Sequence, residues 1–244
     1  MQIITVAIQR GGTAKTTTTA ALAQAAAFTG RHVLAIDLDP QGNLSFTLRA
    51  DTNRQGSLDF LNGEPARHVV QQTADGVDVI PASWGLSTIS SSAGSARRLQ
   101  AALAPIAGRY DLVIIDTPPT AGELQYNALQ AATGLIIPLA ADIFGLQGLY
   151  QITDTAAQIR KTNRGLTVKG IVFTRHNDRS RLARQMQATI TGKAADMGLP
   201  CLGAIREGVA IREAQTLQQS LFKYAPNSKP AADYMNLFNK IMEG

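Results

Sequence analysis

Short apolar runs alternate with longer segments of helical periodicity along most of the chain, and this alternation constrains the fold more than any other feature. The runs are rich in Val, Ile and Leu, as is typical of strands that are buried on both faces of a parallel sheet. The helical segments between them would join consecutive strands by crossovers. We therefore predict a single domain over residues 1–244, with the α/β fold of a doubly wound, mostly parallel sheet flanked by helices.

The expected elements follow from this pattern and bring the carboxyl ends of the parallel strands to one edge of the sheet. Ligands of such sheets bind beyond those carboxyl ends. The stretch between the second and third strands is polar and contains glycine, and no element is assigned there. The expected strands are 3–8, 32–37, 77–81, 111–116, 134–138, 167–174 and 199–205, and the expected helices are 15–29, 95–106, 123–132, 146–162, 180–197 and 228–242.

Composition excludes several classes of protein. The single cysteine, Cys201, excludes an internal disulfide and any site that needs several thiolate ligands from one chain. No apolar run approaches the roughly 18 residues that a membrane span needs. No basic leader precedes the first strand, so we expect a cytoplasmic protein. The only tryptophan, Trp84, is expected to pack inside the fold.

The loop between the first expected strand and the first helix has the composition of a phosphate-binding loop. Glycines let its backbone N–H groups turn toward phosphate oxygens, and the following helix adds free N–H groups and the positive end of its dipole. Lys15 would reach the β- and γ-phosphates, and the hydroxyl of Thr16 would bind Mg²⁺. The strict pattern G-x-x-x-x-G-K-[ST] is not met, because Gln9 and Ala14 occupy its glycine positions, and a plain glycine-rich turn remains the alternative for this motif alone. The predicted nucleotide-binding residues are Gly11, Gly12, Thr13, Ala14, Lys15, Thr16 and Thr17.

Acidic residues follow two of the other expected strands. Asp37 and Asp39 end the second strand and point the same way if the strand continues through them. A carboxylate at this place can hold an attacking water or a metal-bound water, although an Asp-Pro turn is common in any loop. Asp116 directly follows four apolar strand residues, which is the Walker B arrangement, so it would act on Mg²⁺, often through a water.

With these three motifs in this order, the chain resembles the ParA/MinD family of deviant Walker A P-loop ATPases. In that family the loop reads K-G-G-x-x-K-[ST], the second strand ends in D-x-D-P-Q, and the Walker B strand runs into D-x-P-P. The corresponding segments here are 10–16, 37–41 and 116–119. The resemblance covers nearly the whole chain, with residues 50–75 the weakest part. Within the family, the chain looks most like the ParA partition ATPases of plasmids and chromosomes that lack an N-terminal helix-turn-helix.

The resemblance assigns a role to each predicted site residue and makes Lys15, Asp39 and Arg10 the catalytic set. Lys15 and the loop backbone bind the phosphates of ATP, Thr16 and Asp116 serve Mg²⁺, and Asp39 corresponds to the carboxylate that orients the attacking water. In the family's ATP-bound homodimer, the first lysine of the loop motif reaches across to the partner's nucleotide. Arg10 stands at that position here; it keeps the charge and can donate two hydrogen bonds to a phosphate, but it is longer and planar.

The resemblance further implies slow, partner-stimulated ATP hydrolysis, nonspecific binding to nucleoid DNA, and a ParB-like centromere-binding partner. The charge distribution agrees: residues 151–244 hold 14 Lys and Arg against 7 Asp and Glu, whereas residues 1–150 hold 9 against 11. A face of arginines that contacts phosphates would give salt-dependent, sequence-independent affinity. Scattered, solvated arginines are the alternative. The candidate DNA-binding residues are Arg175, Arg179, Arg181, Arg184, Arg206 and Arg212.

Other functions of the same ATPase class remain open. A MinD-like membrane switch would need a terminal amphipathic helix with a basic face, but Lys240 is the only clear basic residue of the last expected helix, so packing against the core and no membrane contact are expected. A cargo-positioning ATPase would use the same switch on a protein cargo. No N-terminal extension precedes the first expected strand, so we expect no helix-turn-helix. Adenine contacts are expected from residues 174–178 and 205–212.

Overall fold

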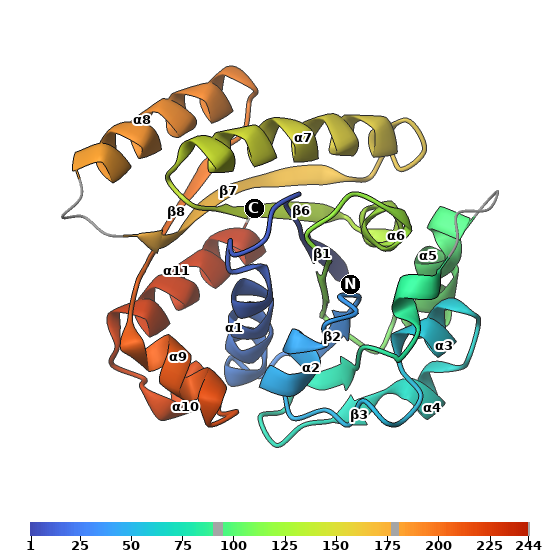
Figure 1. Ribbon diagram of the computed structural model, residues 1–244. Coiled ribbons are helices and arrows are strands. Elements are labelled where there is room, and N and C mark those ends of the chain that lie inside the picture. Colours follow the sequence, from blue (N-terminus) through green and yellow to red (C-terminus); the bar gives the residue numbers. More distant parts are fainter. Residues whose placement is uncertain (90–94, 177–180, 244) are drawn as a thin grey trace.

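The computed structural model describes residues 1–89, 95–176 and 181–243, and it shows one sheet of eight strands with helices on both faces (Figure 1). The strand order is β3-β4-β2-β5-β1-β6-β7-β8. Every described pairing is parallel except that of β3 with β4. This arrangement confirms the predicted fold class. The strands are β1 (Gln2–Val6), β2 (Val33–Asp37), β3 (Gln71–Gln72), β4 (Asp78–Ile80), β5 (Leu112–Asp116), β6 (Gly134–Leu139), β7 (Thr167–His176) and β8 (Cys201–Arg206).

The strands alternate their side chains between the two faces of the sheet, as the period of two requires. Along β2, Val33 and Ala35 face the core that contains the alanines of α1, whereas Leu34 and Ile36 face the core on the other side. In Figure 1, α1 and α11 cover one face, while α7 and α8 cover the other face of β6, β7 and β8. The longer helices are α1 (Lys15–Phe28), α5 (Arg98–Leu103), α6 (Glu123–Ala131), α7 (Ile143–Arg160), α8 (Arg181–Asp196), α9 (Val209–Thr216) and α11 (Lys229–Glu243).

Short elements occupy the stretch that the sequence left without an assignment. The helices α2 (Asn43–Thr47), α3 (Ser57–Leu61) and α4 (Ala66–Val69) precede the two-residue strand β3. None of these helices exceeds five residues, so they carry too few turns to show a helical period. A further short helix, α10 (Leu221–Tyr224), follows α9. Tertiary packing rather than local periodicity therefore determines this part of the fold.

The last helix, α11, packs into the core as the sequence predicted. Tyr234, Leu237, Phe238 and Ile241 are buried against α1 and the sheet. Its apolar face is therefore occupied by the protein itself. Among the described residues, no helix is long and apolar enough to cross a membrane.

The sheet register brings the acidic motifs together. In the pairing of β2 with β5, Asp37 lies opposite Asp116, and Asp116 also lies beside Val6 at the end of β1. The loop from β1 to α1 starts from this same edge (Figure 1). The three motifs therefore converge at the carboxyl ends of the central strands, where α/β sheets bind their ligands.

Candidate nucleotide site

The loop before α1 has the backbone conformation that a phosphate-binding loop requires. Gly12 and Ala14 both adopt positive φ, at 72° and 59°. No side chain caps the N-terminus of α1, and no acidic residue stands in its first turn. The first N–H groups of α1 and the positive end of its dipole are thus available to an anion. The structure therefore supports the predicted role of this loop despite its departure from the strict glycine pattern.

The conformation of Ala14 leads to a stability prediction. Left-handed backbone costs an L-residue roughly 1–2 kcal/mol, and glycine avoids this cost. We expect Ala14→Gly to raise the free energy of unfolding by about 1 kcal/mol, measured by urea denaturation of the nucleotide-free protein. The matched control is Ala21→Gly in the interior of α1, which should lower it by about 1 kcal/mol. Equal losses in both variants would show that Ala14 is not strained.

Thr16 and Asp116 meet directly at the end of β5. The hydroxyl of Thr16 donates to Asp116 Oδ2 at 2.7 Å, and Thr19, which the sequence reasoning missed, donates to Asp116 Oδ1 at 3.3 Å. Asp116 is fully buried, and burial together with the charge of Asp37 raises its pKa. A buried carboxylate beside a second one favours a nearby cation. Oxygen ligands from a hydroxyl and a carboxylate suit Mg²⁺, so these residues fit the predicted metal site.

Lys15 is held inside the loop that it follows. Its side chain is largely buried, and its Nζ donates a hydrogen bond of 2.8 Å to the backbone oxygen of Arg10. Burial lowers the pKa of Lys15, while Asp116 and Asp39 act in the opposite direction. The lysine therefore places a positive charge between the loop and the acidic strand ends. This is where the phosphates of a nucleotide bound to the loop would need it.

The two aspartates of the second motif have different surroundings. The sequence places them on the same side only if the strand continues through both, and this condition is not met, because β2 ends at Asp37. Asp37 is buried and accepts hydrogen bonds from Ser45 N (2.8 Å), Ser45 Oγ (2.7 Å) and Asp39 N (3.1 Å). Asp39 accepts from Gln41 N at 3.0 Å and lines the cavity over the loop. Only Asp39 is thus placed for work on a ligand.

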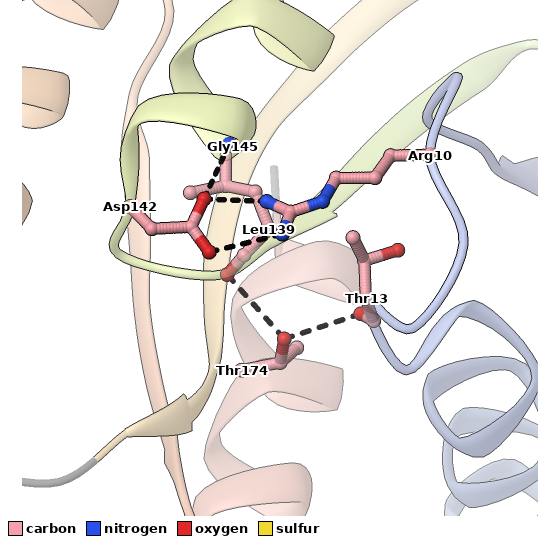
Figure 2. Close-up of polar contacts among 6 residues, drawn as sticks. All are labelled: Arg10, Thr13, Leu139, Asp142, Gly145 and Thr174. Carbon is pink, nitrogen blue, oxygen red and sulfur yellow. Dashed lines mark hydrogen bonds and ion pairs between the residues drawn. The ribbon is translucent and has the colours of Figure 1, made fainter.

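Arg10 points away from the phosphate loop of its own chain. Its guanidinium forms a two-point ion pair with Asp142, with the second contact at 3.0 Å (Figure 2). Its carbon Cζ lies 5.2 Å from the centre of the Phe144 ring. Asp142 also caps α7 by accepting from Gly145 N at 2.7 Å. Burial alone would raise the pKa of Asp142, but the hydrogen bonds from Arg10 and Gly145 outweigh it and lower the pKa. Arg10 is therefore anchored to the start of α7.

Thr174 ties the loop to the neighbouring strand ends. Its hydroxyl lies 3.1 Å from the backbone oxygen of Thr13 and 3.3 Å from that of Leu139 (Figure 2). One hydroxyl proton can serve only one of these oxygens at a time, so the contact is shared. Thr174 is buried at the end of β7, within the range where nucleotide contacts were expected. It fixes the position of the loop relative to the sheet.

Two cavities adjoin the loop. The first, of about 500 Å³, covers the phosphate loop and reaches Asp39, Asn43 and Phe46. The second, of about 200 Å³, lies between α9 and the ends of β7 and β8, and its walls include Ile205, Ile211 and Tyr234. The second cavity coincides with the segments 174–178 and 205–212 that were expected to contact adenine, as far as these are described.

The candidate DNA-binding arginines divide between two places. Arg175, Arg206 and Arg212 line the 200 Å³ cavity. Arg206 forms hydrogen bonds of 2.9 and 2.6 Å with Asp233, and Arg175 lies 3.8 Å from Glu207. Arg181 and Arg184 are exposed in the first turns of α8. Arg179 lies outside the described residues.

Three features together define a P-loop nucleoside triphosphatase. They are a glycine-rich loop with a buried lysine, a hydroxyl–carboxylate pair at the end of the adjacent strand β5, and a doubly wound parallel sheet. A family described as an AAA domain matches residues 1–168. Together with the full-length similarities below, this shows that the chain belongs to the ParA/MinD family of P-loop ATPases.

The relatives and structural neighbours share nearly the whole chain. The chromosome-partitioning ATPase Soj of Thermus thermophilus is 34% identical over 98% of this chain and 94% of its own length. McdA of Cyanothece, solved in its apo form, has a TM-score of 0.88 at 25% identity, covering 100% of this chain and 98% of McdA. MinD of Pyrococcus horikoshii, solved with Mg-ADP, has a TM-score of 0.81 at 25% identity, covering 98% and 95%.

Proposed function

We propose that this ATPase binds Mg-ATP at the loop 11–17, dimerises when ATP is bound, and in that state binds DNA without sequence preference to drive the segregation of a plasmid or chromosome. The observation that carries the nucleotide site is the meeting of the uncapped N-terminus of α1 with Lys15, Thr16 and Asp116. When bound, Mg²⁺ supplies positive charge that stabilises the transferring phosphoryl group. Thr16 and Asp116 hold the ion, and Asp39 orients the attacking water.

The contacts of Arg10 support a role across a dimer interface. Its side chain does not line the 500 Å³ phosphate cavity, which is lined by Gly11 and the residues that follow it. The guanidinium of Arg10 instead lies over the ring of Phe144 at the start of α7, where Phe144 and its neighbour in the chain, Ile143, are 61% and 58% exposed. Large apolar side chains on the surface beside a charged group are typical of a contact surface. In a dimer that buries this surface, Arg10 would exchange Asp142 for a phosphate of the partner's nucleotide.

DNA binding rests on the positive charge of the C-terminal part and on the relatives. Arg181 and Arg184 are exposed on α8, which lies at the edge of the molecule beside β8 (Figure 1). Soj of Thermus thermophilus is described as a chromosome-partitioning ATPase. A ParB-like partner that stimulates hydrolysis, and a location on the nucleoid, complete the proposal.

The test measures binding to nonspecific duplex DNA for the apo, ADP, ATP and slowly hydrolysed analogue states, with dimerisation followed in the same samples. We expect DNA binding only with ATP or the analogue, in step with dimerisation and falling steeply as salt rises. Arg10→Ala should keep nucleotide binding but lose dimerisation and DNA binding, and Arg10→Lys should retain part of both. DNA binding that is equally strong in all nucleotide states would contradict the proposed ATP-dependent switch.

A positioning role on a protein cargo or a membrane is the second candidate, and similarity to MinD of Pyrococcus horikoshii, which is described as a septum site-determining protein, favours a positioning role. Such a protein would dimerise with ATP and yet ignore DNA in the experiment above. Membrane binding through α11 is disfavoured, because its apolar residues are buried in the core. A protein cargo is therefore the form of this alternative that the structure supports better.

A further inference from the structure

Gln215 of α9 lies where the two cavities of the nucleotide site meet. It lines both the 500 Å³ cavity over the loop and the 200 Å³ cavity between α9 and the ends of β7 and β8. Among the residues that the structure describes, Ala14 and Thr17 are the others that line both cavities. If the phosphates occupy the first cavity and the base the second, the sugar between them has to pass these three residues.

The hydrogen-bonding groups of Gln215 and Thr17 match those of a sugar hydroxyl. Gln215 Nε2 donates to Thr17 Oγ1 at 3.1 Å, which leaves the hydroxyl proton of Thr17 free to point elsewhere. Gln215 Oε1 accepts no hydrogen bond from any residue that the structure describes. A hydroxyl both donates and accepts, so it can give its proton to Oε1 and accept the proton of Thr17.

The position of Gln215 is fixed by the core rather than by a ligand. Its neighbour Ala214 is buried in the same core as the alanines of α1, and Thr17 itself belongs to α1. The two side chains are therefore carried by helices that contribute residues to the same core. Side chains that are held in place before the ligand binds lose little conformational entropy on binding it.

We infer that Gln215 and Thr17 form a sugar-reading pair that makes the site prefer ribonucleotides over deoxyribonucleotides. This inference rests on the proposed nucleotide binding and adds to it a specificity that the phosphate loop cannot provide, because phosphates are the same in both kinds of nucleotide. Sites that hydrogen-bond a substrate hydroxyl discriminate against the analogue without it, because their own polar groups are then left unpaired. Gln215 is a specificity residue in this scheme and takes no part in hydrolysis.

The test compares the dissociation constants of ADP, 2′-deoxy-ADP and 3′-deoxy-ADP for the wild type and for Gln215→Leu, by calorimetry in the presence of Mg²⁺. Diphosphates keep hydrolysis out of the measurement. We expect the wild type to bind ADP about 3- to 10-fold more tightly than at least one deoxy form, as one hydrogen bond to a hydroxyl implies. Gln215→Leu should bind ADP more weakly and that deoxy form equally well, so that the preference disappears.

Controls separate this inference from its alternatives. Gln219→Leu changes a nearby glutamine that lines neither of the two cavities and should keep the preference. Thr17→Ser retains the hydroxyl and should keep it as well. The unfolding midpoint of each apo variant shows whether it is folded, and Gln215→Met carries the same test if the Leu variant is unstable.

Two outcomes would overturn the inference while leaving the nucleotide site intact. A wild type that binds ADP and both deoxy forms equally has no sugar-reading pair. If Gln215→Leu weakens the binding of all three ligands by the same factor, Gln215 acts only on Thr17 and the phosphates. If the wild type binds none of the three nucleotides, it is the proposed nucleotide site itself that fails.

Discussion

Replacing Lys15 with Gln is expected to weaken ATP binding by about 100-fold and to abolish hydrolysis. Lys15 is the largely buried cation that the structure places at the phosphate loop, next to the carboxylates of Asp39 and Asp116. Without it, the negative phosphates would approach two carboxylates with no lysine charge between them. One or two charge-assisted hydrogen bonds, each about 1.5–3 kcal/mol, account for a loss of this size.

The measurement is the dissociation constant of a slowly hydrolysed ATP analogue, with steady-state phosphate release in parallel. Lys193→Gln is the matched control, because Lys193 is exposed on α8 and lies 3.6 Å from Asp196. It should change the affinity less than twofold. A Lys15→Gln variant within fivefold of the wild type would show that the phosphates do not bind at this loop.

The features that the sequence predicted correctly are those that local pattern determines. Residues buried in β2 and β5 show as uninterrupted apolar runs, so their ends at Asp37 and Asp116 could be placed within a residue. Because parallel strands share one carboxyl edge, convergence of the loop with these aspartates followed from the order of the elements alone. The start of α1 at Lys15 was likewise predictable from the glycines before it.

Contacts between residues far apart in the chain left no local signal. Arg10 and Asp142 are 132 residues apart, and Thr17 and Gln215 are 198 apart. Only the packing of α7 and α9 around the sheet brings them together. A single sequence does not show such pairs, so neither the anchoring of Arg10 nor the place of Gln215 was predicted.

Trp84 was predicted wrongly because composition favours burial of a large aromatic side chain. Its side chain is 96% exposed, in the turn that follows β4 and immediately precedes Gly85. The turn is fixed instead by its neighbours: Ser83 Oγ accepts from Leu58 N at 3.0 Å, and Gly85 has a φ of 87°. The side chain between them is left to project from the surface.

Asp39→Ala is expected to retain ATP binding and to lower the rate of hydrolysis at least about 100-fold. The carboxylate lines the phosphate cavity, and within the described residues its hydrogen bond is to the backbone of Gln41. A positioned general base or water-orienting group contributes about 10²- to 10⁴-fold to a rate. Because little of the fold depends on this side chain, the free energy of unfolding should change by less than about 1 kcal/mol. Single-turnover hydrolysis and urea denaturation give the two values.

Asp37→Ala makes the same chemical change two residues earlier, and its consequences should be reversed. It removes the acceptor of three hydrogen bonds, two from Ser45 and one from Asp39 N, in a fully buried place. Unpaired buried donors cost about 1–3 kcal/mol each, and relief from burying a carboxylate offsets part of that, so we expect a loss of about 2–3 kcal/mol in the free energy of unfolding. Two results would contradict this division of roles between Asp37 and Asp39. One is an equal loss of stability in both variants, and the other is slower hydrolysis by Asp37→Ala than by Asp39→Ala at a temperature where both are folded. The division assigns anchoring of the loop after β2 to Asp37 and action on the attacking water to Asp39.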